Sequence, residues 1–225
     1  MTMEKLDYKK EYKDLYVPKQ KPTMVDVPTM TFIMVNGSGN PNIEGVEYQH
    51  AIELLYGLSY TIKMSKKNGC QPEDYFDYVV PPLEGLWWLE EDEMDFTQKN
   101  KFSWTSMIRQ PEFVTTEVFQ WACNELKRKK PQIDTAKAYL ETFTEGLCVQ
   151  IMHIGPYDDE PKTIELIETY ISENNFKNAI SLIEHDGRIR RHHEIYLSDP
   201  RKTAPQKLKT VLRHPVVKAE VNINR

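Results

Sequence analysis

The spacing of hydrophobic residues along this chain predicts three long helices. Between residues 44 and 66 apolar side chains recur every three or four positions, and Asn68-Gly69 is a typical helix stop. A second helix is expected over 111–130, because proline is tolerated in a first turn and the basic run at its end suits the helix dipole. The acidic residues from Asp158 onward predict a third helix, which ends near Asn174.

Shorter apolar runs bounded by turn residues predict strands. The segments 139–143 and 147–154 are expected to form a hairpin through Thr144-Glu145-Gly146. The other expected strands are 29–35, 75–80, 86–89 and 191–197. Helices and strands together indicate an α+β protein.

The order of the predicted elements repeats along the chain. Three pairs of residues share one separation of 118 positions: Gly37 and Gly155, Tyr78 and Tyr196, and Pro82 and Pro200. A common register of this kind indicates two strand–helix–strand–strand repeats, although glycine and proline are also common punctuation at turns. The repeats would be related by a pseudo-twofold axis. We expect a mixed or antiparallel sheet, with helices on one face and a ligand cleft on the other.

The chain is expected to form a single domain with short additions at both ends. Residues 1–23 hold a short helix at 4–16 and an extended lead-in. Tyr8, Tyr12 and Tyr16 share one stripe of that helix and are expected to pack on the body. The expected parts are the domain at 24–215, containing repeat one at about 24–92, a linking helix at 111–130 and repeat two at about 137–200, and a tail at 216–225.

Composition excludes several classes of function. The formal net charge of −5 argues against a protein that binds nucleic acid directly. No apolar run approaches the roughly 20 residues of a membrane span, and the charged N-terminus is unlike a secretory signal, so we expect a cytoplasmic protein without a membrane partner. Cys70, Cys123 and Cys148 lack disulfide or metal-site spacing and are expected to be reduced. The unusual feature is the aromatic content, with 12 Tyr, 8 Phe and 4 Trp.

The last predicted strand holds the best candidate for chemistry. Side chains alternate between the faces of a strand, so Ile195 and Leu197 are expected on one face. Glu194, Tyr196 and His192 fall on the other face. If the aliphatic face packs on the helices, Glu194 projects into the cleft, where burial would raise the pKa of its carboxyl group and suit it to act as a base or to attract a cation. The alternative is an exposed strand with a solvated glutamate.

Two motifs in the second half of the chain resemble those of a known family. They are Gly155-Pro156-Tyr157, followed by an acidic helix start, and the run Glu194-Ile195-Tyr196-Leu197-Ser198-Asp199-Pro200. Together they resemble the GyrI-like small-molecule-binding domain, over about residues 24–215. The resemblance implies two strand–helix–strand–strand repeats and a glutamate at the bottom of an aromatic ligand cleft. Glu194 occupies the position of that glutamate, Tyr157 matches the G-P-Y tyrosine and Tyr196 matches the motif aromatic.

The resemblance also implies an activity. Many relatives join this domain to a helix-turn-helix region in drug-responsive regulators, for which residues 1–23 are too short. The chain is similar to the stand-alone branch, which includes cyclopropanoid cyclopropyl hydrolases that open the strained ring of DNA-alkylating agents such as yatakemycin. We therefore expect a flat aromatic ligand, no cofactor and no metal. The resemblance implies that Glu194 positions or deprotonates water and that Tyr157 or Tyr196 stabilises the oxygen that becomes a phenol.

An aromatic cage is part of that expectation. The local candidates for its walls are Trp87, Trp88, Phe102, Trp104, Tyr139 and Phe143. The alternative for each ring alone is a place in the hydrophobic core.

Two other functions stay open at this point. The first is a protein that sequesters planar or cationic drugs without chemistry, through Glu194 and cation–π attraction to the rings. The second is a protein that interacts with a larger partner such as DNA gyrase, although DNA mimicry would need a denser acidic face than a charge of −5 supplies. The oligomeric state does not follow from the sequence.

Other constellations have simpler interpretations. Gly37-Ser38-Gly39 lacks the remaining residues of a phosphate loop, so a tight turn is expected. His192 and His193 are adjacent on a strand and point to opposite faces, so they are not expected to share a metal ion with each other or with His185. His153 ends an apolar strand and is expected to be a core histidine. No Ser-His-Asp or Cys-His pattern supports a catalytic triad.

Overall fold

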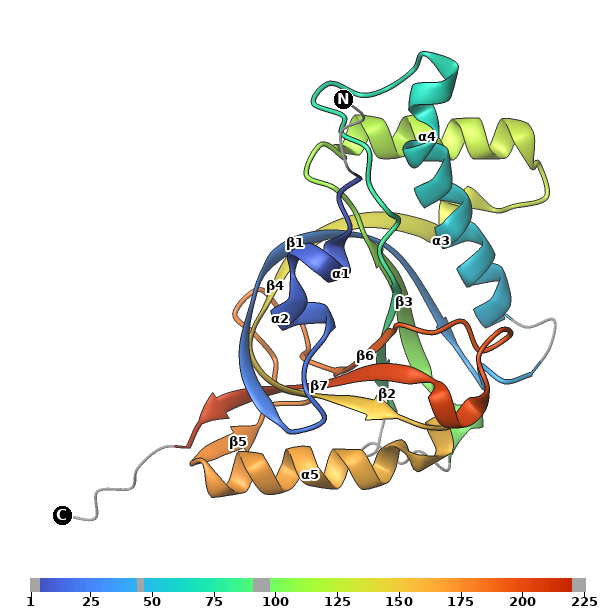
Figure 1. Ribbon diagram of the computed structural model, residues 1–225. Coiled ribbons are helices and arrows are strands. Elements are labelled where there is room, and N and C mark those ends of the chain that lie inside the picture. The colour runs from blue at the N-terminus through green and yellow to red at the C-terminus, as the bar shows by residue number, and fades with distance from the viewer. Residues whose placement is uncertain (1–4, 44–46, 91–97, 220–225) are drawn as a thin grey trace. The chain divides into compact units, whose positions relative to one another are not determined.

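The computed structural model describes residues 5–43, 47–90 and 98–219, and it has the α+β architecture that the sequence predicts (Figure 1). The chain forms two compact units, each built from two separate stretches of sequence. Unit 1 comprises Met1–Lys13 and Thr29–Phe143, and unit 2 comprises Asp14–Pro28 and Thr144–Arg225. Within the described residues, no helix is long and apolar enough to cross a membrane.

The sheet of unit 1 centres on β3 (Ser103–Arg109), which pairs antiparallel with both β1 (Thr23–Ser38) and β2 (Leu83–Trp88). Helix α3 (Glu47–Lys63) packs on β3, and α4 (Thr116–Lys129) packs on α3. The buried side chains of α3 recur every three or four residues, as expected for a helix with one face in the core. They are Ala51, Leu54, Leu55, Leu58, Ser59 and Ile62.

The sheet of unit 2 centres on β7 (Lys209–Lys218), which pairs antiparallel with β4 (Ala138–Ile154), β5 (Phe176–Asn178) and β6 (His192–Tyr196). Helix α5 (Glu160–Glu173) covers one face of this sheet (Figure 1). The core between helix and sheet consists of Val149, Ile151, Ile167, Ile171, Leu212 and Val216, all nearly inaccessible to solvent. Burial of these aliphatic side chains is the main term that holds α5 on the sheet.

Short helical elements complete the described chain. They are α1 (Tyr8–Glu11), α2 (Lys13–Tyr16), η1 (Ser65–Asn68), η2 (Lys99–Lys101), η3 (Thr135–Lys137), η4 (Tyr157–Asp159) and η5 (Pro205–Lys207). The single helix predicted over 4–16 is therefore two short helices, interrupted at Tyr12. The predicted packing of Tyr8 and Tyr16 is confirmed, because each is 1 % exposed.

The start of α4 differs from the prediction. Helix α4 begins at Thr116 and not at Pro111, because the Thr115 hydroxyl accepts a hydrogen bond from the Val118 amide and caps the helix. The predicted start of the first long helix at Glu44 lies outside the described residues, and the structure describes α3 from Glu47 onward.

The strand predicted over 75–80 is wrong. These residues are described and form no strand; Tyr78 makes only an isolated bridge with Leu6. The aromatic residues that gave the segment a strand-like composition pack instead around Phe113, whose ring centre lies 5.2 Å from that of Tyr75 and 6.0 Å from that of Tyr78. Aromatic clustering satisfies these side chains without a hydrogen-bonded partner strand.

The predicted hairpin at 144–146 is also wrong, because β4 runs through these residues as one strand. Gly146 has a positive φ of 72°, so the strand is irregular there. The Arg190 guanidinium donates hydrogen bonds to the carbonyl oxygens of Glu145, at 2.6 Å, and Leu147, at 3.0 Å. A side chain therefore satisfies the backbone groups that flank the irregularity.

The register of 118 residues does not match the observed elements. Each unit does contain the order strand, helix, strand, strand, as β1, α3, β2 and β3 and as β4, α5, β6 and β7. However, Tyr78 precedes β2 whereas Tyr196 is the last residue of β6, so this pair lies at opposite ends of its two strands. The pseudo-twofold axis stays a prediction.

Candidate functional site

Glu194 lies on the face of the unit 2 sheet that α5 covers. It stands opposite Leu212 on β7, and residues directly opposite each other on antiparallel strands point to the same face. Leu212 packs in the core with Ile167 of α5. The expected orientation, with Ile195 toward the helices and Glu194 away from them, is therefore reversed.

The Glu194 carboxylate is buried and held by two neighbours. Its residue is 7 % exposed. The Tyr196 hydroxyl donates a hydrogen bond to Oε2 at 2.7 Å, and His192 Nε2 lies 3.0 Å from Oε1. All three side chains come from alternate positions of β6, as the period of a strand predicts. The contacts that orient the carboxylate thus come from Tyr196 and His192, and no arginine or lysine takes part in them.

The hydrogen-bonded chain continues beyond His192. His192 Nδ1 lies 2.8 Å from Nε2 of His214 on β7, and His214 Nδ1 lies 2.8 Å from Oε1 of Glu168 on α5. Asn178 Nδ2 donates to the same Glu168 oxygen at 2.7 Å. Both histidines are buried, whereas the Glu168 side chain is 44 % exposed. We call Glu194, His192, His214 and Glu168 the imidazole chain.

The pKa values at the outer end of this chain shift in directions set by burial and by the contact between the two groups. Burial lowers the pKa of His214 below its ordinary value, although the hydrogen bond from Glu168 opposes this shift. Burial acts to raise the pKa of Glu168, but the hydrogen bond and charge of His214 outweigh it and lower that pKa overall. Glu168 is therefore held as a carboxylate.

Tyr157 is brought next to Glu194 by the turn before α5. It begins η4, and its ring meets that of Tyr196 edge to face with centroids 6.0 Å apart. Burial, followed by the nearby charges of Glu160, Glu194 and Asp199, raises the pKa of Tyr157 to about 12. Among the described residues its hydroxyl has no hydrogen-bond partner, so it is a neutral O–H donor available to a ligand.

The six predicted cage residues lie in unit 1 and fall into two groups. Trp87, Trp104 and Phe102 form one cluster with Tyr48 of α3: the Tyr48 ring centre lies 5.0 Å from that of Trp104 and 5.6 Å from that of Trp87, and Trp87 lies 5.7 Å from Phe102. Trp87, Trp104 and Phe102 are each at most 5 % exposed. In this structure these rings pack as a core cluster.

The other three cage candidates have polar or ring partners. Trp88 Nε1 donates to Glu90 at 2.8 Å, and the Tyr139 hydroxyl donates to Asn36 Oδ1 at 2.9 Å. Phe143 packs on Phe32, with ring centres 5.3 Å apart. Trp88 and Tyr139 are only half-buried, so they present ring surface that a ligand can reach.

Gly37 belongs to the aromatic cluster and not to a phosphate loop. A Cβ atom at this position would lie 2.3 Å from the Trp104 ring, so only glycine allows the indole to pack there. Gly37 and Ser38 are still part of β1, and Gly39 then takes a positive φ of 99° at the turn. The expectation of a tight turn is confirmed.

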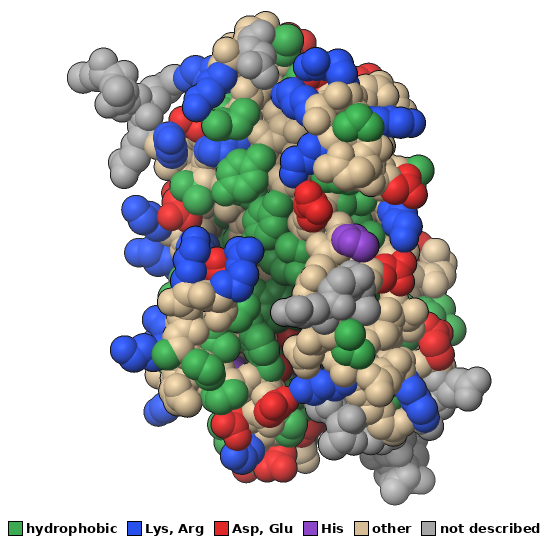
Figure 2. Space-filling model, turned by 90° about the vertical axis from the view of Figure 1, so that its right-hand side faces the viewer, with side chains coloured by type: hydrophobic (Ala, Val, Ile, Leu, Met, Phe, Trp, Pro, Cys, Tyr) green, Lys and Arg blue, Asp and Glu red, His purple; other side chains and the backbone are tan. Residues whose placement is uncertain are grey.

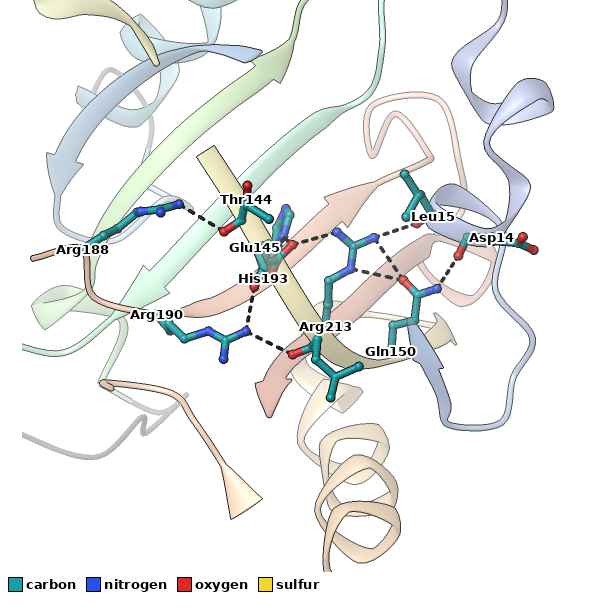
Figure 3. Close-up of polar contacts among 10 residues, drawn as sticks. Asp14, Leu15, Thr144, Glu145, Gln150, Arg188, Arg190, His193 and Arg213 are labelled. Atoms are coloured by element: carbon teal, nitrogen blue, oxygen red, sulfur yellow. Dashed lines mark hydrogen bonds and ion pairs between the residues drawn. The ribbon is translucent and has the colours of Figure 1, made fainter. Parts of the chain in front are cut away.

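A second polar network occupies the other face of β6 (Figure 3). His193 Nδ1 lies 3.1 Å from both carboxylate oxygens of Glu145, and Arg213 Nη1 lies 3.0 Å from Glu145 Oε2. Arg213 also donates to Gln150 Oε1 and, at 2.8 Å, to the carbonyl oxygen of Leu15. Burial alone would raise the pKa of Glu145, but His193 and Arg213 outweigh it and lower that pKa to about 2. We call this set the arginine network.

The structure also places the other histidines that the sequence singled out. His192 and His193 point to opposite faces, and among the described residues no group of three or more His, Cys, Asp or Glu side chains is placed to hold a metal ion. His153 is 4 % exposed and is hydrogen-bonded to the Thr163 hydroxyl and the Pro156 carbonyl oxygen. His185 is exposed. No disulfide joins Cys70, Cys123 and Cys148, all of which are described.

Sequence reasoning missed His214 and Glu168. His214 lies in β7, where no strand was predicted because Arg213 and Pro215 interrupt the apolar pattern. Glu168 is one of several acidic residues on α5, and nothing local distinguishes it. The alternation of His192 and Glu194 was the available signal, since two polar side chains buried on one face of a strand need further polar partners.

Comparison with known proteins agrees with the fold. The model of the GyrI-like small molecule binding domain matches residues 20–217. The chain belongs to this family. No curated protein matches it.

Solved structures give the same assignment. An uncharacterized conserved protein from Listeria innocua is 47 % identical, with a TM-score of 0.86, and the match covers 95 % of this chain and 100 % of that one. A structure described as a hydrolase from Listeria innocua is 46 % identical over the same shares, with a TM-score of 0.83. The EcmrR C-terminal domain is 10 % identical, with a TM-score of 0.51 over 88 % of this chain and 98 % of that one, and shares the fold alone.

Proposed function

We propose that this protein binds flat aromatic small molecules and hydrolyses cyclopropane-bearing DNA-alkylating agents such as yatakemycin. The observation that carries the proposal is Glu194, a buried carboxylate oriented by Tyr196 and His192 inside a small-molecule-binding domain. The structure from Listeria innocua described as a hydrolase supports the choice of reaction class.

The proposed step adds one water molecule across the strained ring. Glu194 accepts a proton from water as the water oxygen forms a bond to the ring CH2 carbon. The carbon–carbon bond of the cyclopropane breaks, and its electron pair passes through the cyclohexadienone to the carbonyl oxygen. That oxygen becomes a phenolate, which takes a proton from solvent to give the phenol, while the proton on Glu194 is returned to solvent. Relief of ring strain and formation of the aromatic ring drive the reaction, so that one oriented base can suffice.

The two tyrosines have different places in this step. Tyr196 already donates its proton to Glu194, so its role is to fix the carboxylate against the attacking water. Tyr157 keeps its proton because its pKa is raised to about 12, and its hydroxyl is the donor we assign to the developing phenolate. The edge-to-face contact of the two rings holds both hydroxyl groups in one neighbourhood.

The ligand rings are proposed to stack on aromatic side chains. Hydrophobic side chains gather on the face shown in Figure 2, with charged side chains around them. Of the six cage candidates, which stay a proposal about unit 1 by itself, the half-buried Trp88 and Tyr139 have ring surface that a ligand can reach. Trp87, Phe102, Trp104 and Phe143 are proposed to support the binding surface from within unit 1.

The substitution Glu194→Gln tests the base. It keeps the size of the side chain but cannot accept the proton of water, so we expect ring opening to slow by roughly 10²–10⁴-fold. The measurement is the appearance of the ring-opened phenol with substrate in excess over protein. Glu165→Gln is the matched control, since Glu165 is exposed on α5 and should leave the rate unchanged. Ring opening by Glu194→Gln at the wild-type rate would remove the assignment.

A non-catalytic drug-binding protein is the alternative. It is favoured by the contacts that orient Glu194, which come from Tyr196 and His192 and not from an arginine or lysine, so that a cationic ligand could take that place. Turnover separates the two functions: a hydrolase opens many rings per protein molecule, whereas a sequestering protein opens none. Retention of gyrase in a pull-down at physiological salt would instead favour the gyrase-interacting alternative.

A further inference from the structure

The imidazole chain contains more hydrogen bonds than two neutral histidines can supply with protons. Three contacts run in series, from Glu194 to His192, from His192 to His214 and from His214 to Glu168. Each contact needs one proton between its two heavy atoms, and a neutral imidazole carries only one N–H. Two neutral histidines between two carboxylates would therefore leave one contact with facing lone pairs.

Neither carboxylate is an obvious carrier of the third proton. Glu194 accepts a hydrogen bond from Tyr196, and Glu168 accepts one from Asn178, and both contacts favour the ionised form. Burial in turn disfavours a charge fixed on one imidazole. The extra proton therefore belongs to the chain as a whole and can occupy any of its three contacts.

We propose that Glu194, His192, His214 and Glu168 form a proton relay that connects the base to solvent at Glu168. If each of the three protons moves outward across its own contact, Glu194 loses a proton and Glu168 gains one, which it releases to solvent. The N–H of each imidazole then lies on its other ring nitrogen, so both rings must return to the first tautomer before the next transfer. The inner members are buried, and the Glu168 side chain is 44 % exposed, so the chain has one inner and one outer end.

The relay gives the proposed hydrolase a route by which Glu194 loses its proton between turnovers. Glu194 accepts one proton from water in each turnover and must lose it before the next. Since Glu194 is 7 % exposed, direct exchange with solvent is restricted, and the relay supplies a second route. This role rests on the proposed function, whereas the existence of the relay does not.

Other charged and titratable groups surround the chain and contribute to its titration. Tyr196 on β6 and Tyr157 on η4 adjoin Glu194, and Asn178 after β5 adjoins Glu168. Glu160 at the start of α5 and Asp199 after β6 act on Tyr157 through their charges. The nearest groups other than the two histidines are thus neutral donors or anions.

Nuclear magnetic resonance of 15N-histidine-labelled protein tests the relay directly, with wild type, Glu168→Gln and Glu165→Gln. In the wild type we expect the ring nitrogens of His192 and His214 to titrate together. Glutamine at position 168 supplies an amide N–H in place of the extra proton, so both histidines should lose protons at a pH lower by about one unit or more. Glu168 also acts on His192 through its charge, so transmission through His214 is read from the joint titration of the two rings and not from a shift of His192 alone.

The control variant and the result that would contradict the relay have different signatures in the titration of the two histidines. Glu165→Gln removes the same charge three residues away on α5 and should leave both titrations in place. If His192 titrates on its own and Glu168→Gln changes His214 alone, no relay exists. This result does not depend on hydrolysis, so it distinguishes failure of the relay from failure of the proposed function.

A kinetic measurement then assigns the role of the relay in turnover. In Glu168→Gln we expect the first ring opening at the wild-type rate and later turnovers several-fold slower, with added imidazole buffer restoring the steady rate. A variant damaged in the reacting geometry would slow the first turnover as well. Equal rates for all turnovers in Glu168→Gln and wild type would overturn the reset role.

Discussion

His192 and His193 are neighbours on β6, but they belong to networks of opposite character. His193 joins the arginine network, where Arg213 provides a permanent positive charge against Glu145. His192 joins the imidazole chain, where two carboxylates face two histidines and a movable proton takes the place of the arginine. One strand therefore presents a fixed ion pair on one face and a titratable chain on the other. The comparison teaches that a buried carboxylate is structural or reactive according to what neutralises it.

The largest expected effect is on stability and comes from the arginine network. Arg213→Met removes the permanent cation and leaves the buried Glu145 with only His193 as a charged partner, so we expect a loss of about 3–5 kcal/mol in the free energy of unfolding. Urea unfolding measures it. Arg201→Met is the matched control, because Arg201 pairs with Asp199 at the surface and is 84 % exposed. A change below about 1 kcal/mol for Arg213→Met would show that the network does not hold unit 2 together.

The second expected effect is a dependence of stability on acid pH. The pKa of Glu145 is lowered from 4.5 to about 2 in the folded protein, so its contribution is full above pH 4.5 and is lost as the pH falls toward 2. Wild type should exceed Glu145→Gln by roughly 2–4 kcal/mol at neutral pH. This difference in the free energy of unfolding should vanish as the pH approaches 2. A gap that stays constant with pH would mean that the charge of Glu145 contributes nothing.

The smallest expected change in stability comes from His193→Gln, and its effects distinguish His193 from His192. His193→Gln loses a hydrogen bond to Glu145 and should lower the free energy of unfolding by about 1–2 kcal/mol, with the rate of ring opening unchanged. His192→Gln should instead slow ring opening and shift its pH profile, because it interrupts the chain at Glu194. Unfolding curves and pH–rate profiles of the two variants, taken together, check the comparison. Identical behaviour would remove the distinction between the two faces.

Local patterns were sufficient to predict the helices and the motif strand, but not the strands with buried polar residues. The spacing of apolar residues predicted α3, and β6 followed from alternation. Strands β3 and β7 were missed because each has several buried polar side chains, which reduce the apolar signal although partners across the sheet satisfy them.

The residues of the candidate site could likewise be predicted only in part. Glu194, Tyr196 and Tyr157 were predicted from motifs, and the structure does bring the three together. The face that Glu194 occupies could not be predicted, because it depends on which residue of β7 stands opposite, and Leu212 settles it. His214 and Glu168 lie 20 or more residues away in sequence, and only the pairing of β6 with β7 and the packing of α5 bring them to His192.

The bond from Arg213 to the Leu15 carbonyl oxygen joins residues 198 positions apart and has a consequence for synthesis on the ribosome. The stretch Asp14–Pro28 emerges early, yet its partners in β4 and β7 are translated only after the whole of unit 1. Contacts so distant in sequence form slowly. Unit 2 is therefore expected to mature last, once β7 has been translated, and the nascent chain carries the stretch Asp14–Pro28 without these partners until then.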